Sequence, residues 1–177
     1  SLTTSSNEGY GGAVYSQYSD TILIENTLFT GNASSEYGGA WAFANTSTLD
    51  VSHVTAVEND SPEGAVGWFS QSSPSVQDSI FAYNIGISMH ADDSASSSGS
   101  YFGYNDWYQN SQGDAGGAFT FLTSQNSSIT SDPLFVQYSQ DGNCSNDNLA
   151  INSTSPASGA ATDGSDLGAF DGPNLVD

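Results

Sequence analysis

Apolar and polar residues occur in short blocks along this chain, and the blocks return about every 26 residues. In four successive repeats an apolar residue stands eight positions before an asparagine, at Ile24, Val51, Val76 and Phe102. A second bulky residue stands three positions before the asparagine at Phe29, Phe81 and Trp107. A fixed period between roughly 20 and 50 residues is typical of proteins built from stacked repeats.

A glycine-rich motif follows the asparagine in most repeats, first as Gly11-Gly12-Ala13 and then as Gly38-Gly39-Ala40. Residues 22–29 are rich in β-branched and aromatic side chains, and so are residues 37–43, which include the second motif. Helical periodicity is missing, because Gly and Ser interrupt every segment that is long enough for a helix. The pattern therefore predicts short strands that are separated by polar turns.

Strands that return at the same place in every repeat predict an all-β protein, a single-stranded parallel β-helix in which each coil lies on the one before it. We expect about six coils. Residues 1–128 should form the coils, and residues 129–177 should form a closing coil and a loop-rich C-terminal cap of the same domain. Ile24, Val51 and Val76 should then meet in one internal column.

The repeating asparagines have a structural explanation in such a fold. Asn tolerates the left-handed backbone conformation of sharp turns better than other non-glycine residues. Stacked Asn amides also form hydrogen bonds from one layer to the next. We therefore predict a structural ladder that consists of Asn7, Asn32, Asn59, Asn84 and Asn110.

Two sets of motifs resemble a known group of proteins. The segments Phe29-Thr-Gly-Asn32 and Gly38-Gly39-Ala40 are similar to the repeats of polymorphic outer-membrane proteins. Asp132-Pro-Leu-Phe135, Ser155-Pro-Ala-Ser158 and Asp166-Leu-Gly-Ala-Phe170 resemble the closing segment of secreted β-helix proteins, although Ser158 replaces the acidic residue that is usual there. The chain thus resembles the pectate-lyase-like superfamily, which implies a right-handed parallel β-helix.

The chain contains no Lys and no Arg, and its formal net charge is −20. Without cationic side chains it has nothing to replace the counterions of a nucleic acid, so nucleic-acid binding is excluded. Attraction to anionic lipid headgroups is excluded for the same reason. No apolar run of about 18 residues is present, so we expect no direct membrane insertion. Carboxylates that protonate in acid would bring the chain close to neutrality, which predicts tolerance of low pH.

The resemblance also implies that an enzymatic activity must be considered. A lyase of the pectate type uses Arg or Lys at the reacting centre, and this chain has neither. A glycoside hydrolase needs two carboxylates that converge on a groove. The nearest pairs in the sequence are Asp92 with Asp93 and Asp163 with Asp166, all in Ser- and Gly-rich segments that favour solvated turns. We therefore expect a protein that is not an enzyme.

Metal binding has one candidate segment in the sequence. Asp141, Asn143 and Asp147 place oxygen ligands at alternating positions, as loops that bind Ca²⁺ do. The segment lacks the glycine and the glutamate of such loops, because Asn146 and Asn152 occupy those positions. An ordinary polar turn is the simpler interpretation. Neither His53 nor His90 adds a recognisable metal motif.

Several features are typical of a secreted glycoprotein. The motif N-x-S/T occurs six times, and Asn45, Asn126 and Asn152 are the best candidates for glycosylation because they lie outside the repeating Asn positions. Cys144 is the only cysteine, so an internal disulfide is impossible. It is either a free thiol or one half of an interchain bridge. These features predict an extracellular or cell-surface location.

Two functions follow from this combination. The first is a structural role, in which β-helix ends or faces associate into an oligomer, a filament or another homopolymer. The second is carbohydrate binding or polysaccharide processing at the cell surface, with Tyr104 and Tyr108 as candidate sugar-stacking residues. Partners would accordingly be further copies of the chain or glycans.

Overall fold

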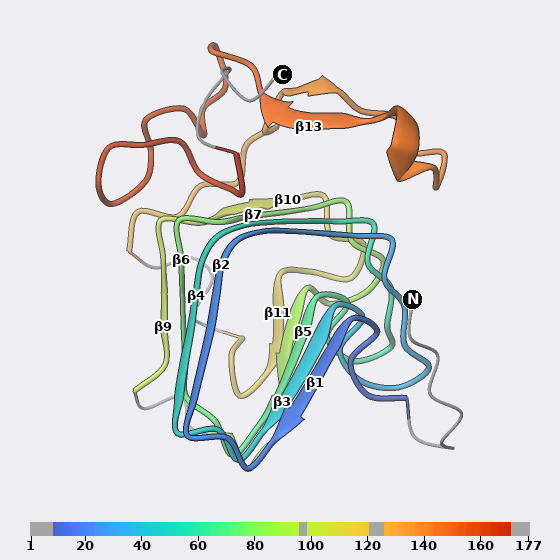
Figure 1. Ribbon diagram of the computed structural model, residues 1–177, viewed down its shortest axis with the longest axis vertical. Coiled ribbons are helices and arrows are strands. Elements are labelled where there is room, and N and C mark those ends of the chain that lie inside the picture. Colours follow the sequence, from blue (N-terminus) through green and yellow to red (C-terminus); the bar gives the residue numbers. More distant parts are fainter. Residues whose placement is uncertain (1–8, 96–98, 121–125, 171–177) are drawn as a thin grey trace.

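The computed structural model describes residues 9–95, 99–120 and 126–170. The described chain is a parallel β-solenoid of about four turns, as Figure 1 shows. The parallel β-helix that the repeat predicts is therefore confirmed. The expected number of about six coils is wrong, because the chain after the last parallel bridge, between Asp106 and Ile129, no longer follows the spiral.

One side of the solenoid is a sheet of parallel strands in the order β1-β3-β5-β8-β11. These strands are β1 (Val14–Gln17), β3 (Trp41–Ala44), β5 (Gly67–Ser70), β8 (Met89–Ala91) and β11 (Ala115–Gly117). Each strand comes from a different turn and pairs in register with the strand of the next turn. Inward-facing Phe43 thus lies beside Phe69, and both side chains are fully buried.

The other sides consist of longer strands that bend at a corner. The first two are β2 (Thr21–Thr30) and β4 (Thr48–Val57), which bend at Asn26 and His53. In later turns the two arms are separate strands: β6 (Pro74–Gln77), β7 (Ile80–Ala82), β9 (Tyr101–Gly103) and β10 (Asp106–Tyr108). All of them pair in parallel, and Figure 1 shows the matching arms lying side by side.

The corner residues share one backbone conformation. Asn26, His53, Asp78 and Tyr104 occupy equivalent corner positions in successive turns and have φ values of 48°, 50°, 54° and 53°. Such left-handed φ values are uncommon outside glycine, and Asn, Asp and His adopt them most readily. The corner therefore explains why polar residues recur in the middle of an otherwise strand-like segment.

The apolar repeat positions form continuous internal columns. Ile24 pairs in register with Val51, Val51 with Val76, and Val76 with Phe102. A second column joins Phe29, Ala56, Phe81 and Trp107. The internal column predicted from the sequence is thus confirmed, and the stacking of like residues in successive turns forms the core.

The C-terminal segment covers the outer face of one side rather than winding as another coil. Its strands β12 (Phe135–Gln137) and β13 (Asn148–Ile151) pair antiparallel, and a short 3-10 helix (Cys144–Asn146) lies between them. Ile151, Ala157 and Leu167 pack against Ile80 and Ala82, which point outward from the solenoid. Figure 1 shows this segment, in orange and red, above β7 and β10.

Polar contacts attach the C-terminal segment to the solenoid. Thr162 donates from its backbone N–H and its hydroxyl to the two carboxylate oxygens of Asp78, at 2.8 and 2.7 Å. The backbone N–H of Gly168 donates to the carbonyl of Asp78, and that of Ala169 donates to Thr55 Oγ1. Gly168 has a φ of 91°, and a Cβ there would lie 2.5 Å from Thr55 Oγ1. The Gly-Ala pair of the closing motif therefore permits a close approach to β4.

Candidate functional site

Asparagine side chains form a hydrogen-bonded ladder along the solenoid axis. Asn32 Nδ2 donates to Asn59 Oδ1 at 2.9 Å, and Asn59 Nδ2 donates to Asn84 Oδ1 at 3.1 Å. Asn84 Nδ2 continues the series to Asn110 Oδ1 at 2.9 Å. Asn7, which the sequence also places in the ladder, lies outside the described residues.

The same amides also bind the backbone of the neighbouring turn. Asn59 Nδ2 donates to the carbonyl of Phe29, and Asn84 Nδ2 to the carbonyl of Ala56, both at 3.0 Å. The backbone N–H groups of Asn32, Asn59 and Asn84 donate to the next Oδ1 in the series. With their donors and acceptors engaged in this way, the buried side chains of Asn59 and Asn84 hold adjacent turns together.

A second polar column was not predicted from the sequence. Ser79 Oγ accepts the backbone N–H of Val54 at 3.0 Å, and Asn105 Oδ1 accepts the backbone N–H of Ser79 at 3.1 Å. Ser128 Oγ then accepts the backbone N–H of Asn105 at 3.3 Å. The residue type changes between Ser and Asn from turn to turn, so no single residue type marks this column in the sequence.

A groove of about 450 Å³ lies where the C-terminal segment meets one corner of the solenoid. Its floor is formed by two neighbouring columns, the corner residues Gly31, Glu58 and Tyr83 and the bridged residues Ala33, Asp60 and Ile85. Its wall is the loop that carries Tyr138, Gln140 and Gly142. Asn32, the outermost described rung of the ladder, separates the two columns at the first turn.

Two tyrosine rings and a carboxylate organise this groove. The Tyr138 hydroxyl donates to Glu58 Oε1 at 3.1 Å. The Tyr83 and Tyr138 rings lie 4.6 Å apart between centroids, with an angle of 31° between their planes. Burial raises the pKa of Tyr83 to about 12, with a further contribution from Asp132. Burial, followed by the charge of Glu58, also raises the pKa of Tyr138, so both phenols are neutral.

Sequence reasoning missed these groove residues. Gly31, Glu58, Tyr83 and Gln109 each precede an asparagine of the ladder, and their φ values lie between 48° and 63°. A position that precedes an inward Asn at a corner projects its side chain outward, and that signal was present in the repeat. Tyr138 could not be found in this way because it belongs to the non-repeating C-terminal segment.

Tyr104 and Tyr108 do not form an open aromatic face. Both are only partly exposed and pack against the apolar cluster beneath the C-terminal segment. The Tyr108 and Tyr83 rings are T-shaped to each other, with centroids 5.4 Å apart and an angle of 89° between their planes. The aromatic residues that line an accessible groove are therefore Tyr83 and Tyr138.

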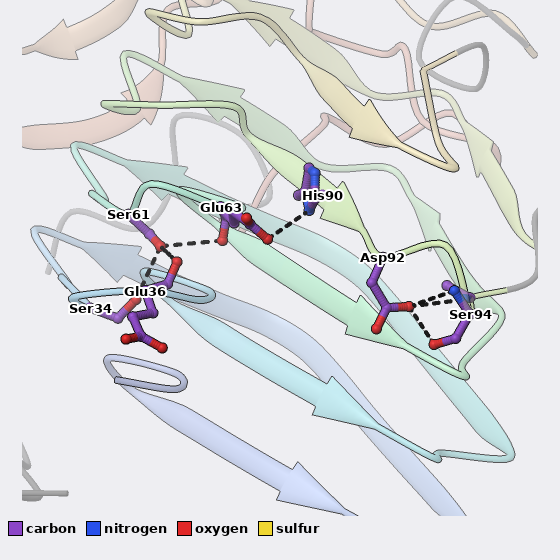
Figure 2. A network of polar contacts seen from close by, with 8 residues as sticks. Ser34, Glu36, Ser61, Glu63, His90, Asp92 and Ser94 are labelled. Atoms are coloured by element: carbon purple, nitrogen blue, oxygen red, sulfur yellow. Dashed lines mark hydrogen bonds and ion pairs between the residues drawn. The ribbon is translucent and has the colours of Figure 1, made fainter. Parts of the chain in front are cut away.

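Polar side chains also follow the loops beside the β3-β5-β8 sheet (Figure 2). Ser34 Oγ donates to Ser61 Oγ at 3.1 Å, and Ser61 Oγ donates to the carbonyl of Glu36 at 3.0 Å. His90 Nδ1 lies 3.6 Å from a carboxylate oxygen of Glu63. Figure 2 shows that His90 and Glu63 come from adjacent turns, so stacking rather than a common loop brings them together.

The acidic pairs considered for catalysis form local turns instead of facing each other across a groove. Asp92 Oδ1 accepts the backbone N–H groups of Ser94 and Ala95, at 2.9 and 3.0 Å. Asp163 Oδ1 accepts the backbone N–H of Ser165, and Asp166 Oδ1 accepts that of Gly159. Burial opposes ionisation of Asp92, but hydrogen bonds from Ser94, Ser70 and the backbone lower its pKa.

The candidate Ca²⁺ segment has a similar arrangement. Asp141 accepts the backbone N–H of Asn143 and the side-chain amide of Asn146, both at 2.9 Å. Asn143 Oδ1 accepts the Ser145 hydroxyl, and Asp147 Oδ1 accepts the backbone N–H of Ser139. Over residues 9–95, 99–120 and 126–170, no group of three His, Cys, Asp or Glu side chains could hold a metal ion.

The glycosylation candidates differ in exposure. Asn126 and Asn152 are exposed, whereas Asn45 is half-buried at a corner with a φ of 54°. Asn152 Oδ1 accepts the hydroxyl of Thr154, the third residue of its own N-x-T motif, at 3.1 Å. Cys144 is exposed with a free thiol.

Within the part of the chain that the structure describes, no helix has the length and apolar character needed to cross a bilayer. Comparisons with protein-family models, with curated proteins and with solved structures find no match for this chain. What is established is therefore the parallel β-solenoid fold, and the resemblance to a particular superfamily depends on the sequence motifs alone.

Proposed function

We propose that this chain is a non-enzymatic structural protein of the extracellular space or cell surface, which polymerises through the ends of its β-solenoid. The observation that carries the proposal is the strand β2, which spans ten residues at one end of the stack. Among the described residues it pairs only with β4, so no described strand engages the backbone groups of its other edge. Such an edge is a template for another strand.

Side-chain exposure at this end supports the same interpretation. Ile24 and Phe29, at the end of the two internal columns, are 9% and 6% exposed, whereas Val51 and Ala56 in the next turn are fully buried. Leu23 and Leu28 beside them are 59% and 38% exposed. A further coil placed on β2 would cover the ends of both columns, because parallel strands pair about 4.8 Å apart.

A second copy of the chain could supply that coil from its opposite end. There the strands β9 and β11 each pair on one side only among the described residues. A head-to-tail contact between two different ends does not close on itself and produces an open filament. The net charge of −20 opposes this contact, so assembly should require salt, divalent cations or acid.

The remaining parts of the proposal concern chemistry and location. Without Lys or Arg the chain lacks the basic residue of a lyase-type mechanism, which favours a non-enzymatic role. The closing motif favours membership of the pectate-lyase-like superfamily with a right-handed coil. The exposed Asn152 and Asn126 motifs favour a glycosylated, secreted chain.

One pair of substitutions tests the assembly. Leu23→Lys places a charge beside the open edge, while Ser75→Lys adds the same charge two turns further along the same outward-facing column. We expect wild type and Ser75→Lys to form polymers at about 0.5 M NaCl, where screening is strong, and Leu23→Lys to remain smaller. Light scattering and negative-stain electron microscopy measure this. A wild-type protein that stays monomeric in salt and in acid contradicts the proposal.

A further inference from the structure

We infer that the groove between the Glu58–Tyr83 corner and the Tyr138 loop binds an organic ammonium ion, such as a quaternary or primary alkyl ammonium group. The groove reaches Gly31 and Asn32 in the first turn, next to the end that the proposed assembly uses. Ligand binding is therefore tested on the monomeric chain at low salt, so that its failure can be told apart from a failure of assembly. The inference depends on the construction, charge and aromatic content of the groove.

The groove has the volume of a small-molecule site. Its volume of about 450 Å³ lies within the usual range for ligand pockets. Ile85 is 52% exposed at its edge, and Gly31 has no neighbouring atom within 4 Å of the position where a Cβ would stand. In the corner column, Glu58 lies between Tyr83 in the turn on one side and Gly31 in the turn on the other. Because Gly31 has no side chain, there is room for a ligand beside the Glu58 side chain.

The charges around the groove have a single sign. Glu58 and Asp60 line it directly. Asp132 acts electrostatically on Tyr83, and Asp147 acts on Tyr138. No lysine or arginine exists in the chain to neutralise these groups. A cleft lined by one sign of charge concentrates counterions, so this groove attracts cations and repels uronates and other anions.

The aromatic rings define which kind of cation fits. The Tyr138 hydroxyl donates to Glu58, which fixes the ring beside the carboxylate. The neighbouring Tyr83 ring also contacts the Tyr108 ring. Aromatic faces attract organic ammonium groups through their quadrupole and also contact the alkyl substituents. A fixed pair of rings beside a carboxylate therefore provides both components that recognise an alkyl ammonium ion.

A hard metal ion matches this groove less well. Ca²⁺ takes six to eight oxygen ligands. The groove offers two carboxylates, and one of them already accepts a hydrogen bond from Tyr138. A neutral sugar could stack on a tyrosine but would gain nothing from the surrounding negative charge. These alternatives give different results in the experiment below.

The experiment is a chemical-shift titration of the ¹⁵N-labelled wild-type chain with choline and with 3,3-dimethyl-1-butanol, its neutral isostere. Choline should bind with a dissociation constant on the order of 1 mM and shift the backbone signals around Glu58, Tyr83 and Tyr138. The isostere should bind at least about fivefold more weakly, because it has the same shape without the charge. Glucose and CaCl₂ serve as the sugar and metal arms.

Three variants locate the site. Glu58→Gln keeps a hydrogen-bond acceptor for Tyr138 and should weaken choline binding about fivefold to tenfold. Glu36→Gln removes one negative charge from a loop that does not line the groove and should bind as wild type does. Tyr138→Ala removes one of the two rings and should weaken choline binding about threefold to tenfold. Equal binding of the isostere or of glucose, a preference for Ca²⁺, wild-type affinity in Glu58→Gln, or no saturable choline binding would overturn the inference.

Discussion

Asn59 and Asn84 lie 25 residues apart in the sequence, in adjacent turns of the solenoid, and their side chains form a direct hydrogen bond. Asn59 donates to Asn84 Oδ1 from both its side-chain amide and its backbone N–H, at 3.1 and 3.0 Å. Both residues are buried, at 0% and 1% exposure. A buried amide N–H that loses its acceptor costs more than the net value of one hydrogen bond. The repeat therefore has an energetic reason to keep Asn at this position.

Removing an inner rung of the ladder should be much more costly than removing the outermost described rung. Asn84→Ala leaves the buried Asn59 donors without their acceptor and should destabilise the fold by about 2–4 kcal/mol. Asn32→Ala should cost about 1 kcal/mol, because Asn32 is half-buried and acts in its ladder contacts as a donor only. Urea unfolding measures the difference. Equal losses in the free energy of unfolding for the two variants would show that the unpaired Asn59 donors do not cause the difference.

The buried carboxyl of Asp106 should make stability decrease as the pH rises. Asp106 is fully buried, one oxygen accepts the backbone N–H of Ser131, and the other has no hydrogen-bond partner in the described residues. Burial raises its pKa from 3.8 to about 7. The folded chain then holds a proton that the unfolded chain loses near pH 4. The stabilisation that comes from this proton is present in full below about pH 4. It is lost as the pH rises from about 4 through 7, and the total loss in the free energy of unfolding is at most roughly 4 kcal/mol.

Asp106→Asn removes this titration. The variant should be more stable than wild type at pH 8 and close to wild type at pH 4, as measured by urea unfolding at both values. Asp92→Asn is the control with the opposite sign. The lowered pKa of Asp92 stabilises the fold above about pH 4 and is lost on acidification, so this substitution should cost stability at pH 8. A wild-type pH dependence in Asp106→Asn would show that another group is responsible.

Asp78 should control the attachment of the C-terminal segment. Both of its carboxylate oxygens accept hydrogen bonds from Thr162, which lies 84 residues further along the chain. Asp78→Asn keeps a residue that tolerates the left-handed corner but removes one of the two acceptor oxygens for Thr162. It should raise amide hydrogen exchange around Thr162 and Gly168 at least about threefold, while the exchange of β4 near Val51 changes little. Asp50→Ala, on the exposed outer face of β4, is a control that should leave the C-terminal segment protected. Uniform loss of protection would mean that the segment and the solenoid unfold as one unit.

The solenoid and its columns could be predicted because the repeat contains the required information. Val51 and Val76 occupy the same place in successive periods, and the stacking of turns converts that place into contact. The ladder follows from the same argument, since asparagine marks each of its described rungs. Where residue types change from turn to turn, as in the column of Ser79 and Asn105, the contact could not be predicted from the repeat.

The C-terminal segment could not be placed from the sequence. Its contacts join residues far apart, such as Thr162 with Asp78, and it carries no repeat. The number of coils was overestimated because this segment was counted as a continuation of the spiral. One clue was present, since Ile80 and Ala82 are apolar although they flank the inward Phe81 and so must point outward. Apolar residues on both faces of a strand indicate a second layer.

The groove was missed for a related reason. Glu58 and Tyr83 are corner residues whose outward direction follows from the repeat. Their significance appears only when Tyr138 lies beside them, and Tyr138 is 80 residues away from Glu58 in the non-repeating segment. A site between a regular and an irregular element depends on docking, which local sequence patterns do not specify.

The most direct test of in-register stacking is disulfide trapping on the outer face of the solenoid, in a Cys144→Ser background. Asp50 pairs in register with Ser75, and Ser75 pairs with Tyr101 one turn further on. Cα atoms of adjacent strands lie about 4.8 Å apart, within reach of a disulfide, whereas two turns span roughly 10 Å. We predict that Asp50→Cys with Ser75→Cys forms an intramolecular disulfide on mild oxidation, and that Asp50→Cys with Tyr101→Cys does not. Bridging of the second pair, or failure of the first, would contradict the stacked solenoid.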